Sequence, residues 1–135
     1  MNLDAILKPY GAVEALLEDW SRAARRPVSL EGLIGQWRRL IDRAEVGYRL
    51  SLDDYLNDVE AREMLDKARQ ASHGELAGEL AAALMPLDER FVAATEVSDA
   101  LERVSPWSAR LPRKMGHEMR AQLRDLERAR RREWK

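Results

Sequence analysis

The sequence predicts an all-α protein, a single-domain bundle of five or six mostly antiparallel helices over residues 1–135. Apolar residues recur at intervals of three and four along almost the whole chain, which is the spacing of one helix face. No segment alternates apolar and polar residues over a useful length, so strands are not expected. The composition is 45% hydrophobic and 35% charged, as is typical of a folded domain with a highly charged surface.

Two helices are expected in the first third of the chain. The apolar spacing predicts the first over residues 6–24, and Pro27 ends this segment because the residue before a proline avoids the helical region. Ser29 is a candidate N-cap for the second helix, since its hydroxyl can accept a hydrogen bond from the first turn. Trp37 lies in the middle of the second apolar stripe and is expected in the core, and Gly47 is the expected end of this helix.

Two further helices follow in the middle of the chain. Ser51 and Asp54 resemble a capping box in which Asp replaces the usual Glu, and they predict a helix that closes at residues 72–74. Residues 75–85 then form a short, alanine-rich helix. We expect it to stop before Pro86, because proline removes a helical hydrogen bond and clashes with the preceding turn.

The C-terminal part of the chain is predicted as a helix, a loop and a final helix. Apolar residues over 87–104 indicate the first of these helices. Two prolines within residues 105–112 favour a loop, since a regular helix cannot run between them. The final helix begins near Gly116 and runs to the end of the chain, with an apolar seam of Met115, Met119, Leu123 and Leu126.

The composition argues against several classes of function. The chain has no cysteine, which excludes disulfides, thiol nucleophiles and Cys-ligated metals, and its two histidines leave little room for a His-rich site. We expect no metal or other cofactor, and the absence of a catalytic constellation favours a non-enzymatic protein. No apolar run approaches the ~20 residues of a membrane span, and the N-terminus does not resemble a signal peptide. We therefore expect a cytoplasmic protein without membrane contact.

The charges are unevenly distributed. Residues 1–109 hold 13 basic and 20 acidic side chains, whereas residues 110–135 hold 10 basic and 4 acidic side chains. The chain thus divides into an acidic body (1–109) and a basic C-terminal loop and helix (110–135). Two explanations remain open: the basic helix could dock beside an acidic helix of the same molecule, or one of the two regions could bind a charged partner.

The leading hypothesis for function is protein binding through an acidic helix face. Asp53, Asp54 and Asp58 lie in the densest group of carboxylates, and Trp107 lies in the predicted loop beside Arg110. A carboxylate-rich face can cover a basic site on another protein, and Trp is a favoured anchor at interfaces. An immunity-type or antitoxin-type inhibitor, or an adaptor, would use such a face. Trp107 could equally fold back over the bundle.

The first alternative is nucleic-acid binding through the basic C-terminal helix. Arg120, Arg124, Arg128 and Arg131 follow each other at spacings of four, four and three, which allows them to line one face of that helix. Arginines in this arrangement could contact successive phosphates. The same amphipathic helix could also pair with its copy, so a homo-oligomer is compatible with either hypothesis.

The second alternative is a metal-dependent phosphohydrolase. Glu60 and Glu63, with Glu96 and Asp99, form an E-x-x-E…E-x-x-D arrangement. It resembles the magnesium-binding pattern of the MazG-like all-α nucleotide pyrophosphohydrolases, and the resemblance implies four inward carboxylates that hold Mg²⁺ against substrate phosphates. However, Glu96 and Asp99 fall opposite the apolar stripe of their predicted helix, so they are expected to face water.

Overall fold

The chain folds as a helical bundle, as predicted. A computed structural model describes residues 3–6, 11–101 and 105–133. Over these residues it contains a short 3-10 helix, five α-helices and two three-residue strands. In chain order these elements are η1 (Leu3–Ile6), α1 (Gly11–Ala24), α2 (Leu30–Val46), α3 (Leu52–Ala71), α4 (Gly74–Ala94), β1 (Thr95–Val97), β2 (Arg110–Pro112) and α5 (His117–Glu133).

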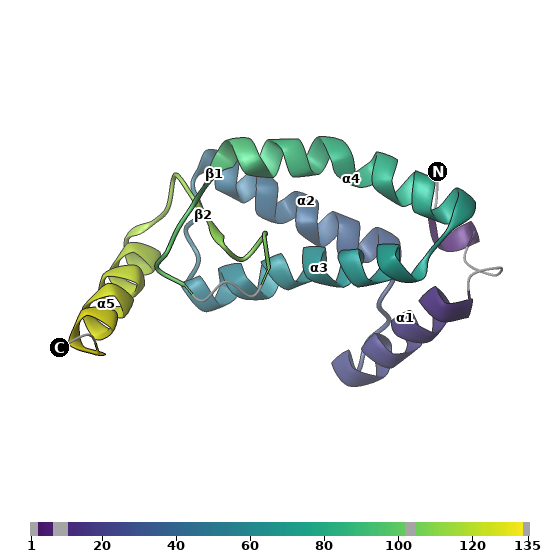
Figure 1. Ribbon diagram of the computed structural model, residues 1–135, viewed down its shortest axis with the longest axis horizontal. Coiled ribbons are helices and arrows are strands. Elements are labelled where there is room, and N and C mark those ends of the chain that lie inside the picture. Colours follow the sequence, from purple (N-terminus) through teal and green to yellow (C-terminus); the bar gives the residue numbers. More distant parts are fainter. Residues whose placement is uncertain (1–2, 7–10, 102–104, 134–135) are drawn as a thin grey trace.

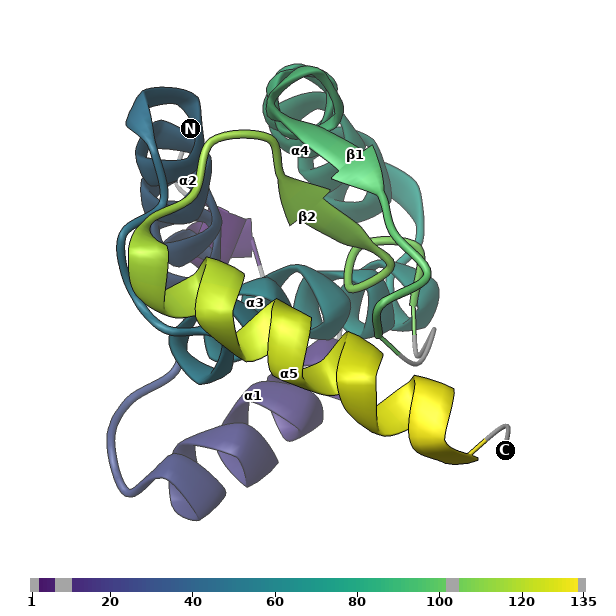
Figure 2. The same cartoon turned by 90° about the vertical axis from the view of Figure 1, so that its left-hand side faces the viewer.

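Three helices form the body of the bundle. Helices α2, α3 and α4 lie side by side, and the short connections between them make α3 antiparallel to both neighbours (Figure 1). Helix α1 packs against α3 near one end of this body, and α5 lies at the opposite end. Figure 2 shows α5 crossing α3 and extending beyond the bundle. No helix in the described part of the chain is both long enough and apolar enough to cross a membrane.

The ends of the central helices follow the local signals in the sequence. The Ser29 hydroxyl accepts a hydrogen bond from the Gly32 amide at 3.0 Å and caps α2. Ser51 and Asp54 form the predicted capping box at the start of α3, each side chain accepting from the other's backbone amide. Gly47 ends α2 with a backbone φ of 136°, a value that residues with a Cβ atom rarely adopt. All three predictions are confirmed.

The core is one continuous cluster of buried side chains that extends from η1 to α5. Trp37 is at its centre with 0% exposure, and its ring lies 4.5 Å from that of Phe91 on α4. Tyr48 and Tyr55, also fully buried, stack edge to face at 5.2 Å. The position predicted for Trp37 is therefore correct, whereas Trp20 is only partly buried against the core.

The prediction that a helix stops before Pro86 is wrong, because α4 continues through this residue to Ala94. Pro86 is exposed, while Leu84 and Leu87 beside it are buried. A proline inside a helix costs about 3 kcal/mol, but each buried leucine contributes about 1.5–3 kcal/mol. The apolar face of α4 therefore outweighs the missing hydrogen bond.

The predicted helix over residues 87–104 and the predicted loop over 105–112 are each only partly correct: residues 87–94 are helical and residues 105–109 form turns. Helix α4 ends at Ala94, and β1 then pairs with β2 in an antiparallel ladder in which Glu96 faces Leu111. Strands of three residues are too short for an alternating pattern to be recognised. Residues 102–104, which include Val104 of the predicted stripe, lie outside the described residues. At the other end of the chain, α1 begins at Gly11, and residues 7–10 of the predicted first helix are likewise outside.

Candidate functional site

The first half of α5 is anchored to the bundle. Met119 and Leu123 are buried, as the predicted apolar seam requires, and the Gln122 side-chain oxygen accepts a hydrogen bond from the Leu52 amide at 2.7 Å. The segment before the helix is held by Tyr48, whose amide donates to the Lys114 carbonyl at 2.9 Å and whose carbonyl accepts from the Gly116 amide at 2.7 Å. These contacts fix the direction in which α5 leaves the bundle.

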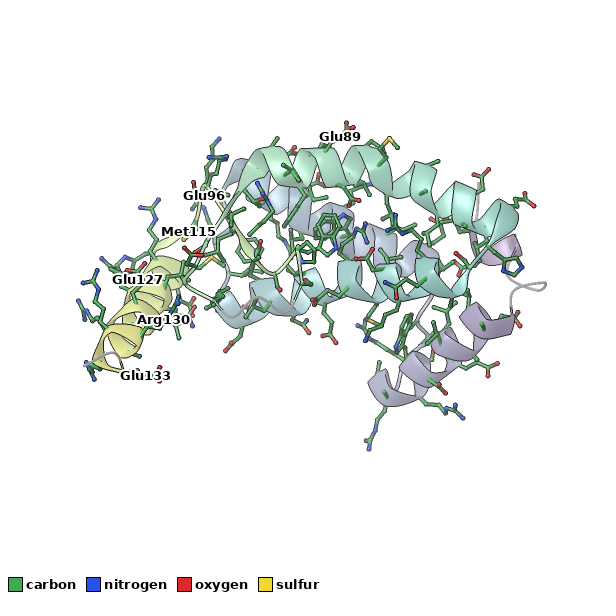
Figure 3. All side chains as sticks on the ribbon, viewed as in Figure 1. Glu89, Glu96, Met115, Glu127, Arg130 and Glu133 are labelled. Atoms are coloured by element: carbon green, nitrogen blue, oxygen red, sulfur yellow. The ribbon has the colours of Figure 1, made fainter. Side chains whose placement is uncertain are left out.

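The second half of α5 is surrounded by solvent. Every side chain from Arg124 to Glu133 is exposed, and Leu126 of the predicted seam is itself 37% exposed. Figure 3 shows Glu127, Arg130 and Glu133 on this projecting part of the helix. Burial by the bundle therefore stabilises only the anchored half.

Four arginines line one face of α5 as the spacing predicts, and we call Arg120, Arg124, Arg128 and Arg131 the arginine stripe. All four are exposed. Arg128 lies 4.0 Å from Asp125, a contact between side chains that are both mostly in solvent. Within the described part of the chain, the other three form no ion pair. The stripe thus presents four cations that the fold itself leaves almost unneutralised.

A basic hollow of about 620 Å³ lies between the end of α2 and the start of α5. Its cationic side chains are Arg49, Arg113, Lys114 and Arg120, and Glu118 is the acidic residue that lines it. Arg113 lies 3.4 Å from Glu96, and the Lys114 ammonium donates to the Glu45 carbonyl oxygen at 3.4 Å. Arg120 belongs to both the basic hollow and the arginine stripe, so the two surfaces are continuous.

The three predicted acidic site residues have different environments. Asp53 is exposed, whereas Asp54 belongs to the capping box of α3. Asp58 accepts a hydrogen bond from the Tyr48 hydroxyl at 2.9 Å and lies 3.6 Å from Arg43. Burial, and then this hydrogen bond to Asp58, raise the pKa of Tyr48 above its ordinary value. Asp54 and Asp58 therefore stabilise the fold. Of the three predicted residues, Asp53 is the one without a described hydrogen bond or ion pair in the fold.

Trp107 folds back over the bundle. Its indole N–H donates to an Asp66 carboxylate oxygen at 2.8 Å, and its ring lies edge-on to Trp37 at 5.8 Å between centroids. The Arg62 guanidinium lies 4.2 Å from the centre of the Trp107 ring, within the range of a cation–π contact. Of the two interpretations of Trp107, the structure shows the internal one.

Arg62 is the centre of a polar network that the sequence analysis missed. Its side chain is 2% exposed; Nε and Nη2 donate to both Asp88 oxygens at 2.9 and 2.8 Å, and Nη1 donates to Asp66 at 2.6 Å. The Trp37 indole also donates to Asp88, at 3.1 Å. Burial alone would lower the pKa of Arg62, but the hydrogen bonds to Asp88 and Asp66 outweigh it, so this pKa is raised.

A second depression, the acidic hollow, lies along α3 beside α1. It has a volume of about 600 Å³ and combines the apolar side chains of Trp20, Leu56 and Met64 with the carboxylates of Glu60 and Glu63. Asp66 and Lys67 also line it. Because Asp66 already accepts hydrogen bonds from Arg62 and Trp107, the two glutamates are the acidic groups left for an external cation.

The four carboxylates of the MazG-like pattern do not form a metal site in this fold. Glu60 and Glu63 lie on α3, whereas Glu96 lies on β1 and is paired with Arg113. Asp99 follows β1 and is exposed. Among the described residues, no group of three or more histidines and carboxylates is arranged to hold a metal ion.

The described chain therefore carries two charged surfaces of opposite sign: the basic hollow with the arginine stripe at one end, and the acidic hollow along α3. The chain matches no family model, and neither the curated proteins nor the solved structures include a match to it. Its function has to be inferred from these two surfaces.

Proposed function

We propose that the protein binds nucleic acid through the phosphate backbone, with the arginine stripe of α5 as its main contact. The observation that carries this proposal is a row of four exposed arginines on a helix that is anchored at one end and surrounded by solvent at the other. Arginine suits this role because its planar guanidinium can donate two parallel hydrogen bonds to one phosphate.

The spacing of the stripe matches a regularly charged polymer. With a rise of about 1.5 Å per residue, neighbouring arginines at i and i+4 are separated by about 6 Å along the helix axis. The whole stripe from Arg120 to Arg131 then spans about 16 Å. Successive phosphates of one strand recur at a comparable step, so the stripe can contact several of them at once.

The internal explanation for the uneven charge has no support in the contacts of α5. Helix α5 packs on α3 through Met119 and Leu123 and through the hydrogen bond between Gln122 and the Leu52 amide. Within the described part of the chain, no ion pair joins α5 to α3. The arginines are therefore not held by the acidic body, and their charges are available to a partner.

Fluorescence anisotropy with a labelled 20-base-pair duplex, measured over a series of salt concentrations, tests the proposal. If four phosphates are neutralised, the plot of log affinity against log salt should have a slope near −3.6. Changing Arg120, Arg124 and Arg128 together to Gln should abolish most of the binding. The matched control changes three exposed arginines far from α5, namely Arg25, Arg26 and Arg38, so that net charge falls equally.

The outcome separates a localised site from general attraction. Loss of binding in the α5 variant, with binding retained in the control, supports the proposal. An equal loss in both variants would show that only net charge matters, and no binding at 50 mM salt would refute the proposal. The acidic body, which carries 20 acidic and 13 basic residues, should restrict binding to low salt.

A protein partner is the second candidate, and the acidic hollow favours it. Trp20, Leu56 and Met64 offer apolar area beside Glu60 and Glu63, a combination that is complementary to a segment of alternating basic and apolar residues. The inhibitor or adaptor role expected from the acidic character of α3 would then use these glutamates, because Asp54 and Asp58 are engaged inside the fold.

Calorimetry with a synthetic 12-residue peptide of alternating Lys and Leu tests the second candidate. Changing Glu60 and Glu63 together to Gln should weaken binding. The control changes Glu75 and Glu89 to Gln, two exposed carboxylates on α4 that do not line the hollow. Binding that is unaffected by both pairs of changes would refute a role for the acidic hollow.

A further inference from the structure

We infer that the basic hollow receives the terminal phosphomonoester of a nucleic-acid strand whose backbone follows the arginine stripe. This inference rests on the proposed function and adds to it a preference for phosphorylated strand ends. It concerns a site, the basic hollow, in which Arg49, Arg113 and Lys114 come from outside α5.

The charge of the hollow suits a dianion. Its four cations face one lining carboxylate, that of Glu118. Among the described residues Arg49 and Arg120 form no ion pair, and the contacts of Arg113 and Lys114 are both as long as 3.4 Å. An internal phosphodiester carries a single negative charge, whereas a phosphomonoester carries about −1.5 to −2 at pH 7. The hollow therefore has more positive charge than one backbone phosphate requires.

Backbone contacts hold the cationic segments together. Tyr48 and Met115 form an isolated parallel bridge, which places Arg49 beside the segment that contains Lys114. At Gly116, a Cβ atom would lie only 3.2 Å from the Arg49 Cα, so the two segments approach closely. The Gly116 amide already donates to the Tyr48 carbonyl, so this amide is not available to an anion in the hollow. The backbone segments that carry these side chains therefore lose little freedom on binding an anion.

The size and position of the hollow match a strand end. Its volume of about 620 Å³ exceeds what one phosphate group needs and is within the range of small-molecule sites. Val46, which is 83% exposed, and Met115 also line it and offer an apolar surface to the last sugar or base. Arg120 lines the basic hollow and is also the first arginine of the stripe. A strand that follows the stripe therefore reaches the hollow at Arg120.

The test compares 12-nucleotide single strands of one sequence that carry a 5′-phosphate, a 3′-phosphate or hydroxyls at both ends. We expect one of the phosphorylated strands to bind at least about fivefold more tightly than the hydroxyl strand, from additional charged contacts. Arg49→Gln should reduce this preference to about one. Arg128→Gln, in the stripe, should weaken binding of all three strands and keep the preference. Arg38→Gln, an exposed arginine elsewhere on α2, is the control and should change neither quantity.

Each result separates the inference from the proposed function. If all three strands bind with the same affinity, and with the expected salt dependence, the strand-end inference is wrong and the proposed function stands. If the duplex binds but no single strand does, the strand-end inference fails and the proposed function stands. If neither duplex nor single strands bind, both fail. Adenosine monophosphate and inorganic phosphate serve as competitors. If either binds as tightly as the preferred strand, and Arg49→Gln removes that binding, the hollow takes a free phosphate compound and the strand-end inference is overturned.

Discussion

Arg62 and the arginines of α5 are placed in opposite environments in this protein. Arg62 is 2% exposed, and its guanidinium donates to two carboxylates and contacts the Trp107 ring. Arg124 and Arg131 are exposed and, within the described part of the chain, have no acidic partner. A guanidinium enters a core only when its charge and N–H groups are satisfied there, and it is then unavailable to a ligand. The surroundings of each arginine, rather than the number of arginines, therefore indicate which ones bind a partner.

The same contrast exists among the carboxylates. Asp66 and Asp88 are engaged by Arg62 and by indole N–H groups, so their charges stabilise the interior. Asp42 and Glu45 bind Arg90 on the surface, and the hydrogen bond from Arg90 lowers the pKa of Glu45. Glu60 and Glu63 line the acidic hollow without such partners among the described residues. Substitutions at engaged charges should therefore lower stability, whereas substitutions at available charges should affect binding.

The largest effect is expected from Trp37→Ala, in the core beside the Arg62 network. The free energy of unfolding should fall by about 5 kcal/mol, the upper end for an aromatic-to-alanine change. The variant loses ring contacts with Phe91 and Trp107 and the hydrogen bond to Asp88. Urea unfolding followed by circular dichroism measures the change. Trp20→Ala is the control, because Trp20 is only partly buried, and an equal loss in both variants would contradict the central role of Trp37.

Arg62→Met should have the next largest effect. Removing the cation leaves Asp88 without a cationic partner and Asp66 with only Arg69, 4.0 Å away. Breaking a buried pair costs about 3–5 kcal/mol. We expect the lower end, about 3 kcal/mol, because the Asp66 and Asp88 side chains are 26% and 21% exposed and water can reach them. Arg124→Met in α5 should change the free energy by less than about 0.5 kcal/mol.

A rescue experiment tests whether the carboxylates left behind cause the loss of stability in Arg62→Met. Arg62→Met combined with Asp66→Asn and Asp88→Asn removes the uncompensated charges and should recover part of the lost stability. If the triple variant were less stable than Arg62→Met alone, the carboxylates would have to be stabilised by something other than Arg62. The same denaturant titration measures all of these variants.

The features that the sequence predicted correctly depend on neighbours along the chain. The caps at Ser29 and Ser51 and the helix end at Gly47 depend on residues within one turn. The helical period alone places the four arginines of the stripe on one face of α5. The features that were missed depend on tertiary contacts. Helix α4 passes through Pro86 because its leucines are buried. The β1–β2 pair joins Thr95 to Pro112, which are far apart in the sequence.

The candidate site shows the same division. The arginine stripe could be predicted, but the basic hollow could not, because it brings Arg49 next to Arg113 and Arg120 through the bridge between Tyr48 and Met115. One signal for the Arg62 network was present. Arg62 lies three residues after Val59 and three before Leu65, so it occupies a buried position of the α3 stripe and requires acidic partners.

A smaller effect is expected within the acidic group on α3. Asp58→Ala should lower the free energy of unfolding by about 1–2 kcal/mol, because it leaves the buried Tyr48 hydroxyl without its acceptor. Asp54→Ala should cost about 1 kcal/mol through loss of the capping box. Asp53→Ala, on the same turn and exposed, is the control and should stay within about 0.5 kcal/mol. Equal values for all three would show that Asp54 and Asp58 are as free as Asp53.

The smallest effect on stability is expected from removing the end of α5. Deleting residues 127–135 removes only exposed side chains among those described, so the free energy of unfolding should change by less than about 0.5 kcal/mol. Deleting the helix from residue 117 also removes Met119 and Leu123, each worth about 1.5–3 kcal/mol, and serves as the contrasting variant.

The short deletion should nevertheless affect binding strongly, since it leaves only Arg120 and Arg124 of the stripe. With about two phosphates neutralised, the salt slope on a duplex should fall to about −1.8. A stable short variant that keeps the full slope would place the phosphate contacts elsewhere on the molecule.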